Sequence, residues 1–263
     1  MAILEVNKLT KSFGGLTAVS NVNMSLKDGE LVGLIGPNGA GKTTLFNLLT
    51  GVYTPTSGTI TFTRNGVKKE IQGLKPYTIC EAGIARTFQN IRLFKDLTVF
   101  DNVRIAMHKN VKYGLLSGLF HLPSCNKEEK RLTEETMELL NIVKLDHKKD
   151  EYAKNLPYGE QRRLEIARAL ATNPTLLLLD EPAAGMNPAE TAELTEFISW
   201  IREKFKLTIL LIEHDMSLVM KICERIYVLD YGIMIANGTP DEIKTNKRVI
   251  EAYLGEDVNN ARD

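Results

Sequence analysis

The sequence has few cysteines, no long apolar run and no net charge, and each absence narrows the class of protein. Its 263 residues contain 3 cysteines, and 33 basic side chains balance 33 acidic ones. Scattered thiols give neither a disulfide framework nor the spacing of a metal site, and they indicate a reducing compartment. No apolar run approaches the roughly 20 residues that span a bilayer, and the N-terminal residues lack the pattern of a signal peptide. We therefore expect a cytoplasmic protein that binds no nucleic acid and reaches a membrane only through partners.

The order of apolar and polar residues predicts an α/β fold. Hydrophobic residues make up 43% of the chain and charged residues 25%, which is ordinary for a globular domain. Two buried strand patterns, 176–179 and 209–212, flank a helical pattern at 189–204, and this rhythm predicts a parallel sheet. The region from about 77 to about 171 is predicted to be mostly helical. The other expected strands are 2–9, 19–26, 59–63, 226–229 and 233–236, and the other expected helices are 127–145, 160–171, 240–245 and 247–253.

The stretch 36–44 is the most informative part of the sequence. It reads GPNGAGKTT and fits the phosphate-binding pattern G-x-x-x-x-G-K-[ST]. An apolar run, Leu31–Ile35, precedes it as a buried strand, and leucines with helical spacing follow it. Glycines let backbone N–H groups surround a phosphate, and the helix N-terminus adds its positive dipole end. The predicted nucleotide-binding residues are Gly36, Pro37, Asn38, Gly39, Ala40, Gly41, Lys42, Thr43 and Thr44.

Two acids end the buried strand at 176–179 and complete this prediction. Ligands of an open α/β sheet bind at the carboxyl ends of its strands. We therefore expect Asp180 to hold Mg²⁺ through a water molecule, the Thr43 hydroxyl to bind the same cation, and Glu181 to orient or deprotonate an attacking water. Lys42 would reach the β- and γ-phosphates of the nucleotide. An apolar run followed by acids is a weak signal by itself, and it gains its weight from the phosphate loop.

The segment 156–161 reads LPYGEQ and precedes a basic helical pattern at 162–170. Here the chain resembles the ATP-binding cassette (ABC) family, whose signature is usually LSGGQ. Its other elements follow in the family's order: the phosphate loop, Gln89 in RTFQ, the signature, the acid pair and His214. The resemblance implies a P-loop NTPase of the ABC type that hydrolyses ATP with Mg²⁺. Its fold would combine a mostly parallel core sheet, an N-terminal antiparallel β-subdomain and a helical subdomain.

The resemblance also implies roles for further residues. Gln89 would ligate Mg²⁺ or position water, and its loop would face the transport subunit. His214 would touch the γ-phosphate, and Phe13 would stack on adenine. Gly159 and Glu160 of the signature would contact the ATP held by a partner cassette. Three of these residues have a plainer alternative. Gln89 would then be an ordinary polar loop residue, His214 a hydrogen-bonded structural residue and Phe13 a core aromatic.

The signature departs from the family pattern at Pro157, which has neither a hydroxyl nor an N–H group. A contact with the partner's ATP would then depend on the N–H of Gly159 and on the N-terminus of the following helix. Proline suits a helix start. We expect the site to work without the usual serine, or the partner subunit to supply the better signature.

Several segments indicate which branch of the family the chain is similar to: RTFQNIRLF at 86–94, EPAAGMNP at 181–188, IEHDM at 212–216 and AYLGE at 252–256. Together with the LPYGE signature they resemble the larger ATP-binding subunit of branched-chain amino acid importers. The implied partners are two integral-membrane permease subunits, a second ABC ATPase in a heterodimer or homodimer, and indirectly a periplasmic solute-binding protein. Such a subunit would lie on the inner face of the cell membrane. The alternatives are a urea or amide importer, a lipopolysaccharide exporter and a soluble ABC protein.

The same resemblance implies how the chain is divided. A RecA-like core with the antiparallel strands would occupy about 1–90 and 172–238, a helical subdomain about 91–171, and a C-terminal helical extension 239–263. The glycine-rich stretch 113–122 belongs to an insertion from about 107 to about 127 that could contact a membrane subunit. A surface insertion with a small apolar anchor is the alternative.

Overall fold

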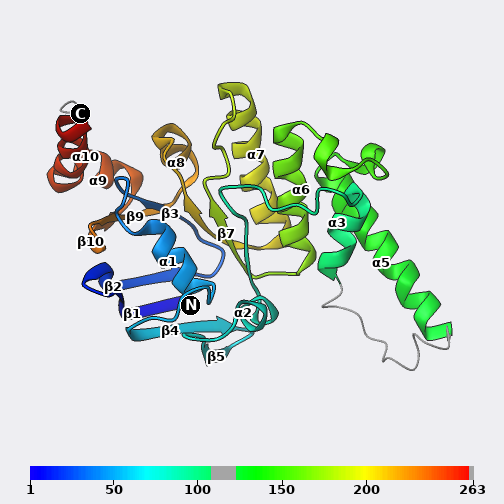
Figure 1. The fold of residues 1–263 in the computed structure, drawn as a ribbon, viewed down its shortest axis with the longest axis horizontal. Coiled ribbons are helices and arrows are strands. Elements are labelled where there is room, and N and C mark those ends of the chain that lie inside the picture. The colour runs from blue at the N-terminus through cyan, green and yellow to red at the C-terminus, as the bar shows by residue number, and fades with distance from the viewer. Residues whose placement is uncertain (108–122, 261–263) are drawn as a thin grey trace. The chain divides into compact units, whose positions relative to one another are not determined.

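The computed structural model describes residues 1–107 and 123–260, and for 123–125 and 255–260 it describes only the helical backbone. The chain forms two compact units, one made of Met1–Arg86 and Thr175–Asp263, the other of Thr87–Pro174. Figure 1 shows the elements of both units in chain order. The stretch 113–122, for which a contact with a membrane subunit and a surface insertion are the two alternatives, lies outside the described residues.

The first unit contains an antiparallel sheet of 4 strands in the order β2-β1-β4-β5. Polar and apolar residues alternate along its two long strands, so one face is buried and the other is exposed. The short edge strand β5 was not predicted, because each of its residues is exposed and no apolar periodicity marks it. The bounds of the strands are β1 (Ala2–Phe13), β2 (Leu16–Lys27), β4 (Ser57–Arg64) and β5 (Val67–Glu70).

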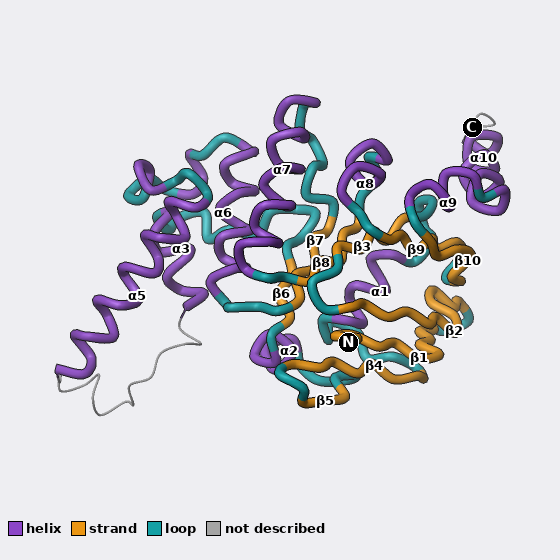
Figure 2. Tube along the Cα trace, turned by 180° about the vertical axis from the view of Figure 1, so that it is seen from behind, coloured by secondary structure: helices purple, strands orange, loops and turns teal. Residues whose placement is uncertain are grey.

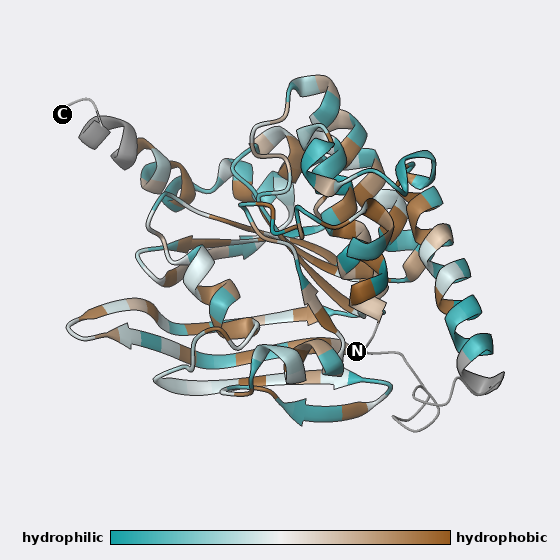
Figure 3. Cartoon of the chain, turned by 45° about the vertical axis from the view of Figure 1, so that its right-hand side comes forward, coloured by the Kyte–Doolittle hydropathy of each residue, from teal (hydrophilic) through white to brown (hydrophobic). Residues whose placement is uncertain are grey.

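The second sheet of this unit has 6 strands in the order β10-β9-β3-β8-β7-β6. Its strands run parallel except β10, which pairs antiparallel with β9, so the predicted mostly parallel core sheet is confirmed. The central strands β3, β7 and β8 are buried along their whole length and are mostly hydrophobic, as Figure 3 shows. The bounds are β3 (Leu31–Ile35), β6 (Ile84–Arg86), β7 (Leu176–Asp180), β8 (Thr208–Ile212), β9 (Arg225–Asp230) and β10 (Ile233–Gly238).

Helices cover both faces of the six-stranded sheet. In Figures 1 and 2 the helix α1 lies between the two sheets, whereas α7 and α8 lie on the opposite face of the six-stranded sheet. Alternate residues of the core strands, such as Val32, Leu178 and Leu210, share one buried cluster with Phe46 of α1. On the other face, Gly33 packs closely against Val219 of α8. The helices of this unit are α1 (Lys42–Leu49), α2 (Pro76–Ala82), α7 (Pro188–Phe205), α8 (Met216–Ile222), α9 (Pro240–Thr245) and α10 (Lys247–Asn260).

The second unit is helical, as the sequence indicates. Its helices are α3 (Val99–Ala106), α5 (Pro123–Ile142) and α6 (Tyr158–Ala171), with single turns at Asp146–Lys148 and Ala153–Asn155. Among the residues that the structure describes, no helix is long and apolar enough to cross a bilayer. One strand, β6, interrupts the stretch predicted to be helical and belongs to the sheet of the first unit. Three residues are too few for a strand periodicity to appear in the sequence.

The apolar layer beneath α1 should contribute strongly to stability. Leu210 is 0% exposed in the centre of β8, so Leu210→Ala should lower the free energy of unfolding by about 2–5 kcal/mol, because it leaves a cavity. Leu16→Ala, at a side chain that is 68% exposed, is the control and should change it little. Urea unfolding followed by circular dichroism measures both. Equal midpoints for the two variants would contradict this packing.

Candidate nucleotide site

The phosphate loop joins β3 to α1 and is held in shape by its own lysine. The Lys42 ammonium donates hydrogen bonds to the carbonyl oxygens of Gly36 at 2.5 Å and Pro37 at 2.8 Å. Lys42 is buried, whereas Thr43, the next residue of α1, is exposed. The first N–H groups of a helix have no partner within the helix. The loop therefore combines a fixed positive charge, helix N–H groups and an accessible hydroxyl, which suits a phosphate with a bound cation.

Close packing against two strands explains why glycines occupy this loop. Gly36 has a φ of 151°, and a Cβ atom there would lie 1.9 Å from the carbonyl oxygen of Leu229. Gly41 has a φ of 100°, and its Cβ would lie 2.4 Å from the carbonyl oxygen of Ala18. Real Cβ atoms do not approach backbone so closely, and L side chains rarely adopt these φ values. The loop is thus seated between β9 and β2.

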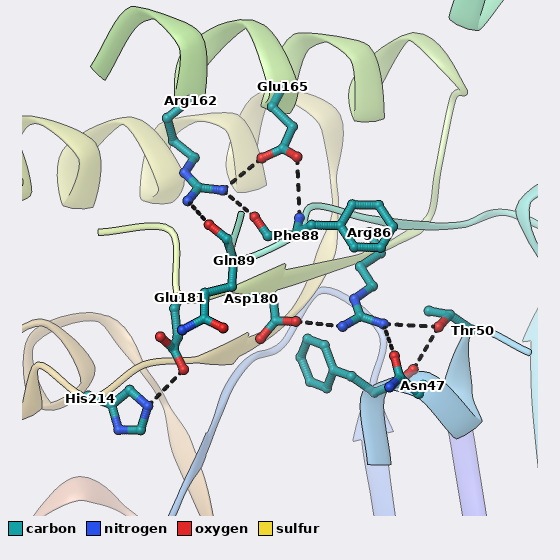
Figure 4. A network of polar contacts seen from close by, with 11 residues as sticks. Asn47, Thr50, Arg86, Phe88, Gln89, Arg162, Glu165, Asp180, Glu181 and His214 are labelled. Atoms are coloured by element: carbon teal, nitrogen blue, oxygen red, sulfur yellow. Dashed lines mark hydrogen bonds and ion pairs between the residues drawn. The ribbon is translucent and has the colours of Figure 1, made fainter. Parts of the chain in front are cut away.

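The acid end of β7 is the second part of the site. Asp180 is the last residue of the strand and is only 3% exposed. Its Oδ2 accepts a hydrogen bond of 2.6 Å from Nη2 of Arg86, as Figure 4 shows. The sequence did not mark Arg86 as a functional residue. Hydroxyl and carboxylate oxygens such as those of Thr43 and Asp180 are donors that fit Mg²⁺.

Glu181 and His214 meet beyond the ends of β7 and β8. Oε1 of Glu181 lies 2.7 Å from Nε2 of His214 (Figure 4). Glu181 has a φ of 46°, a left-handed conformation that costs a non-glycine residue free energy. Its N–H donates to the carbonyl oxygen of Ile212, which holds the residue in this conformation. Such strain gathers at functional sites, and here it aims the carboxylate at the histidine.

Glu213 fixes the backbone around this pair. Its carboxylate is buried and accepts hydrogen bonds from the N–H groups of Ala183 at 2.7 Å and His214 at 3.1 Å. Burial raises the pKa of Glu213 above its ordinary value, against the effect of these hydrogen bonds. Two separate chain segments are tied by one side chain. Glu213 could not be found from the sequence, because a buried acid next to a predicted site residue has no pattern of its own.

An aromatic pair forms at the end of β1, an inner strand of the antiparallel sheet. Phe13 is half-exposed at the end of β1, and its ring meets that of Tyr53 edge to face at 5.2 Å. The Lys11 ammonium lies 4.9 Å from the Phe13 ring and donates to the carbonyl oxygen of Thr54. Phe13 is therefore not a core residue. Tyr53 was missed, because only the fold brings it beside Phe13.

The second unit presents the signature at the start of α6. Pro157 is the residue before the helix, and Gly159 lies in its first turn. The carboxylate of Glu160 accepts hydrogen bonds of 2.9 and 2.7 Å from the Lys148 ammonium. That hydrogen bond raises the pKa of Lys148. The helix begins earlier than predicted, so the N–H of Gly159 belongs to the unsatisfied first turn.

A buried ion pair within the second unit holds the loop that carries Gln89. Arg162 and Glu165 of α6 are 0% and 5% exposed and are joined at 2.7 Å. Arg162 donates to the carbonyl oxygens of Phe88 and Gln89, and Glu165 accepts from the N–H of Phe88 (Figure 4). The backbone of this loop is thereby fixed to the signature helix. Gln89 itself is exposed.

The first unit therefore brings together the phosphate loop with the ends of β7 and β8, and so unites most of the residues predicted from sequence. These are Gly36, Pro37, Asn38, Gly39, Ala40, Gly41, Lys42, Thr43, Thr44, Asp180, Glu181 and His214. Gln89, Gly159 and Glu160 belong to the second unit. Their place at the nucleotide stays a prediction, as does adenine stacking by Phe13.

Comparison with known proteins bears directly on this site. The family described as "ABC transporter" matches residues 19–184, a span from β2 across the phosphate loop and signature to the acid pair. The chain belongs to the ABC transporter family. It is an ABC ATPase and binds ATP. A second match, to the family described as "Branched-chain amino acid ATP-binding cassette transporter", covers residues 234–259 of this cassette.

Individual relatives cover almost the whole cassette. The "High-affinity branched-chain amino acid transport ATP-binding protein LivG" of Salmonella typhimurium is 50% identical over 97% of this chain and 98% of its own. The protein BraF of Pseudomonas aeruginosa, with the same description, is 48% identical over the same shares. Among solved structures, an ATP-binding cassette of an ABC transporter in its ADP conformation matches with a TM-score of 0.82 and 32% identity, over 97% of this chain and 99% of that one.

The position of Lys42 predicts how nucleotide affinity depends on it. Lys42→Ala in the cassette should weaken ATP binding at least 100-fold, because the buried ammonium of the loop is lost. Lys69→Ala, on the exposed strand β5, is the control and should bind like the unmodified protein. Equilibrium titration with a fluorescent ATP analogue measures both. A Lys42→Ala variant with unchanged affinity would contradict the placement of the phosphates at this loop.

Proposed function

We propose that this cassette is the subunit that hydrolyses ATP to power the import of branched-chain amino acids through a membrane permease. The contact between Glu181 and His214, at the sheet edge that carries the phosphate loop, supports hydrolysis at this site. The cargo is proposed from the likeness to LivG and BraF over 97% of the chain and from the match at residues 234–259. None of the predicted site residues would touch the cargo.

The phosphate loop would bind ATP through its N–H groups and through the Lys42 ammonium. The ammonium, now held by two loop carbonyls, would turn to the β- and γ-phosphates. Thr43 and Asp180 would hold Mg²⁺, with Gln89 as a further ligand. The cation held by these residues would supply positive charge against the negative charge that develops on the phosphates. Phe13 would stack on adenine through its π-face.

Glu181 would act on the attacking water. Phosphoryl transfer to water depends on positioning and on charge stabilisation more than on covalent chemistry. The carboxylate of Glu181 accepts a hydrogen bond from the water, orients it in line with the leaving group and takes up its proton. His214, which contacts the same carboxylate, would touch the γ-phosphate. Loss of that phosphate would then remove the contact with His214 beyond the end of β8.

The work of transport would come from pairing with a second cassette. Each ATP would lie between the phosphate loop of one cassette and the signature of the other, so that hydrolysis opens the pair. At the signature, Gly159 and the first turn of α6 would serve in place of a serine hydroxyl, and Glu160 would be held by Lys148. The partner would be a related ATPase or a second copy of this chain.

The loop that follows β6 would pass the motion to the permease. Arg162 and Glu165 bind its backbone to the signature helix, so the loop would move with that helix. The cassette would therefore sit on the cytoplasmic face of the membrane against two permease subunits. A periplasmic binding protein would deliver the cargo to them from the other side.

A lipopolysaccharide exporter is the second candidate, because one relative at 35% identity is the "Lipopolysaccharide export system ATP-binding protein LptB" of Escherichia coli. The identity to LivG is higher, at 50%, and the match at residues 234–259 favours the importer.

The role of Glu181 can be tested by removing its charge alone. Glu181→Gln should keep ATP affinity within about threefold and lower the ATPase rate by at least 100-fold, because an amide cannot accept the proton of the water. It should also stabilise an ATP-bound pair of cassettes on gel filtration. Phosphate release measures the rate, and Glu196→Gln on α7 is the matched control. An unchanged rate in Glu181→Gln would refute the assignment.

The transport function can be tested through the proteins that accompany the cassette. Purification from membranes with a tag on this chain should recover two integral-membrane subunits and a second cassette. The associated periplasmic protein should bind leucine, isoleucine or valine in equilibrium dialysis. Recovery of a lipopolysaccharide transport complex would favour the second candidate, and recovery of no membrane protein would refute the transport proposal while leaving the ATPase untouched.

A further inference from the structure

Arg86 is a nearly buried arginine in the first unit to which none of the motifs above gives a role. It ends β6 at the edge of the six-stranded sheet, and its side chain is 7% exposed. The carboxylate that it meets, Asp180, is 4% exposed. Two charged groups have thus been taken out of water at the edge of the apolar core, and their removal from water has a large free-energy cost.

The register of the sheet directs Arg86 toward α1. Arg86 pairs with Leu178 in parallel β6 and β7, and side chains two residues apart on one strand share a face. Leu178 belongs to the buried cluster that contains Phe46 of α1. Arg86, Leu178 and Asp180 therefore lie on the face of the sheet that α1 covers, and Figure 4 shows the arginine reaching from that strand toward α1.

The guanidinium joins α1 to the end of β7. Nη2 donates to Oδ2 of Asp180 at 2.6 Å, and Nη1 donates to Oδ1 of Asn47 at 2.6 Å and to Oγ1 of Thr50 at 3.4 Å. The guanidinium carbon lies 5.5 Å from the centre of the Phe46 ring. Two nitrogens of one rigid plane thus bind two different elements. A lysine, with a single nitrogen on a flexible stem, cannot reproduce this geometry.

These two elements carry two of the protein oxygens proposed to hold Mg²⁺. Thr43 lies on α1, which begins at Lys42, and Asp180 ends β7. Mg²⁺ requires near-ideal octahedral geometry with bonds of about 2.0–2.1 Å, so the distance between its donors must be well defined. A buried ion pair is weak evidence for stability, because apolar residues of similar volume often serve as well. Its benefit here is the fixed relation between α1 and the carboxylate.

We propose that Arg86 is a positioning residue that sets the distance between Thr43 and Asp180 and thereby the affinity of the nucleotide-bound cassette for Mg²⁺. This inference rests on the proposed nucleotide site and adds to it a residue that contacts neither metal nor nucleotide. Residues that orient the ligands of a metal typically change its affinity by 10–100-fold when they are replaced. Arg86 should act on metal affinity, whereas Lys42 should act on nucleotide affinity.

The test measures metal and nucleotide affinity separately on the full chain. Mn²⁺ serves as the probe and is titrated into protein saturated with a non-hydrolysable ATP analogue, with free Mn²⁺ read by electron paramagnetic resonance. Arg86→Met should weaken Mn²⁺ binding 10–100-fold and change analogue affinity in excess EDTA by less than about threefold. Arg86→Lys should fall between Arg86→Met and the unmodified protein, because it keeps the charge but not the double contact.

The matched control is Arg225→Met, which breaks a second ion pair of the same sheet. Arg225 pairs with Glu30 at 2.7 Å and begins β9, so it lies at the edge opposite to the end of β7. Burial raises the pKa of Glu30, but hydrogen bonds from Arg225 and the Lys27 N–H outweigh it and hold that pKa below its ordinary value. Arg225→Met should lose stability and keep Mn²⁺ affinity.

Further variants keep the test decisive if Arg86→Met fails to fold. Asn47→Ala removes only the α1 end of the link and should still weaken Mn²⁺ binding several-fold. Unchanged Mn²⁺ affinity in Arg86→Lys and Asn47→Ala would overturn the proposal, and so would a parallel loss in Arg225→Met. Unmodified protein that binds no ATP analogue would refute the nucleotide site itself. Normal binding by the unmodified protein together with unaffected variants would refute only the role of Arg86.

Discussion

The close packing of the phosphate loop against β2 and β9 is the constraint on which the site depends. Gly36 and Gly41 bring loop backbone against the carbonyl oxygens of Leu229 and Ala18, where no side chain fits. The loop is therefore shaped by the sheets and not by a ligand. The Lys42 ammonium is held by two carbonyls of the same loop, from which it would turn to a phosphate. Preorganisation of this kind reduces the free-energy cost of binding.

The ends of the parallel strands supply the rest of the chemistry to the same edge. β7 ends in Asp180 and continues into Glu181, which is held in a left-handed conformation next to His214. Glu213 anchors the backbone on both sides of this contact. Asp180, Glu181 and Glu213 each have a defined hydrogen-bonding partner. A strained backbone and buried hydrogen bonds thus hold these carboxylates beside the phosphate loop.

Buried ion pairs position functional groups in both units. Arg162 and Glu165 use a fully buried ion pair to hold the backbone of the loop around Gln89. In the first unit, Arg86 holds the carboxylate of Asp180 at the end of β7 through another ion pair. In both cases an arginine binds groups far apart in the sequence, which an apolar residue could not do. Polar contacts position the functional groups, and the apolar layers provide the stability.

The sequence predicted the parallel sheet, the phosphate loop and the acid pair, because each has a local pattern of spacing or hydrophobicity. Arg86, Tyr53 and Glu213 could not be found in this way. Arg86 ends a strand that is too short to recognise, and its partners Asn47 and Asp180 lie far away along the chain. Tyr53 meets Phe13 only after the strands fold. Contacts of this kind depend on register and topology, which no single segment encodes.

We expect the loop and the end of β7 to be formed before nucleotide binds. High-resolution crystal structures of the protein, without ligand and with a non-hydrolysable ATP analogue, test it when superposed on β3, β7 and β8. The backbone of residues 36–44 and 180–181 should move by less than about 1 Å, while the Lys42 side chain leaves its two carbonyls for the phosphates. A loop that refolds around the nucleotide, or an Asp180 that leaves Arg86 entirely, would contradict it.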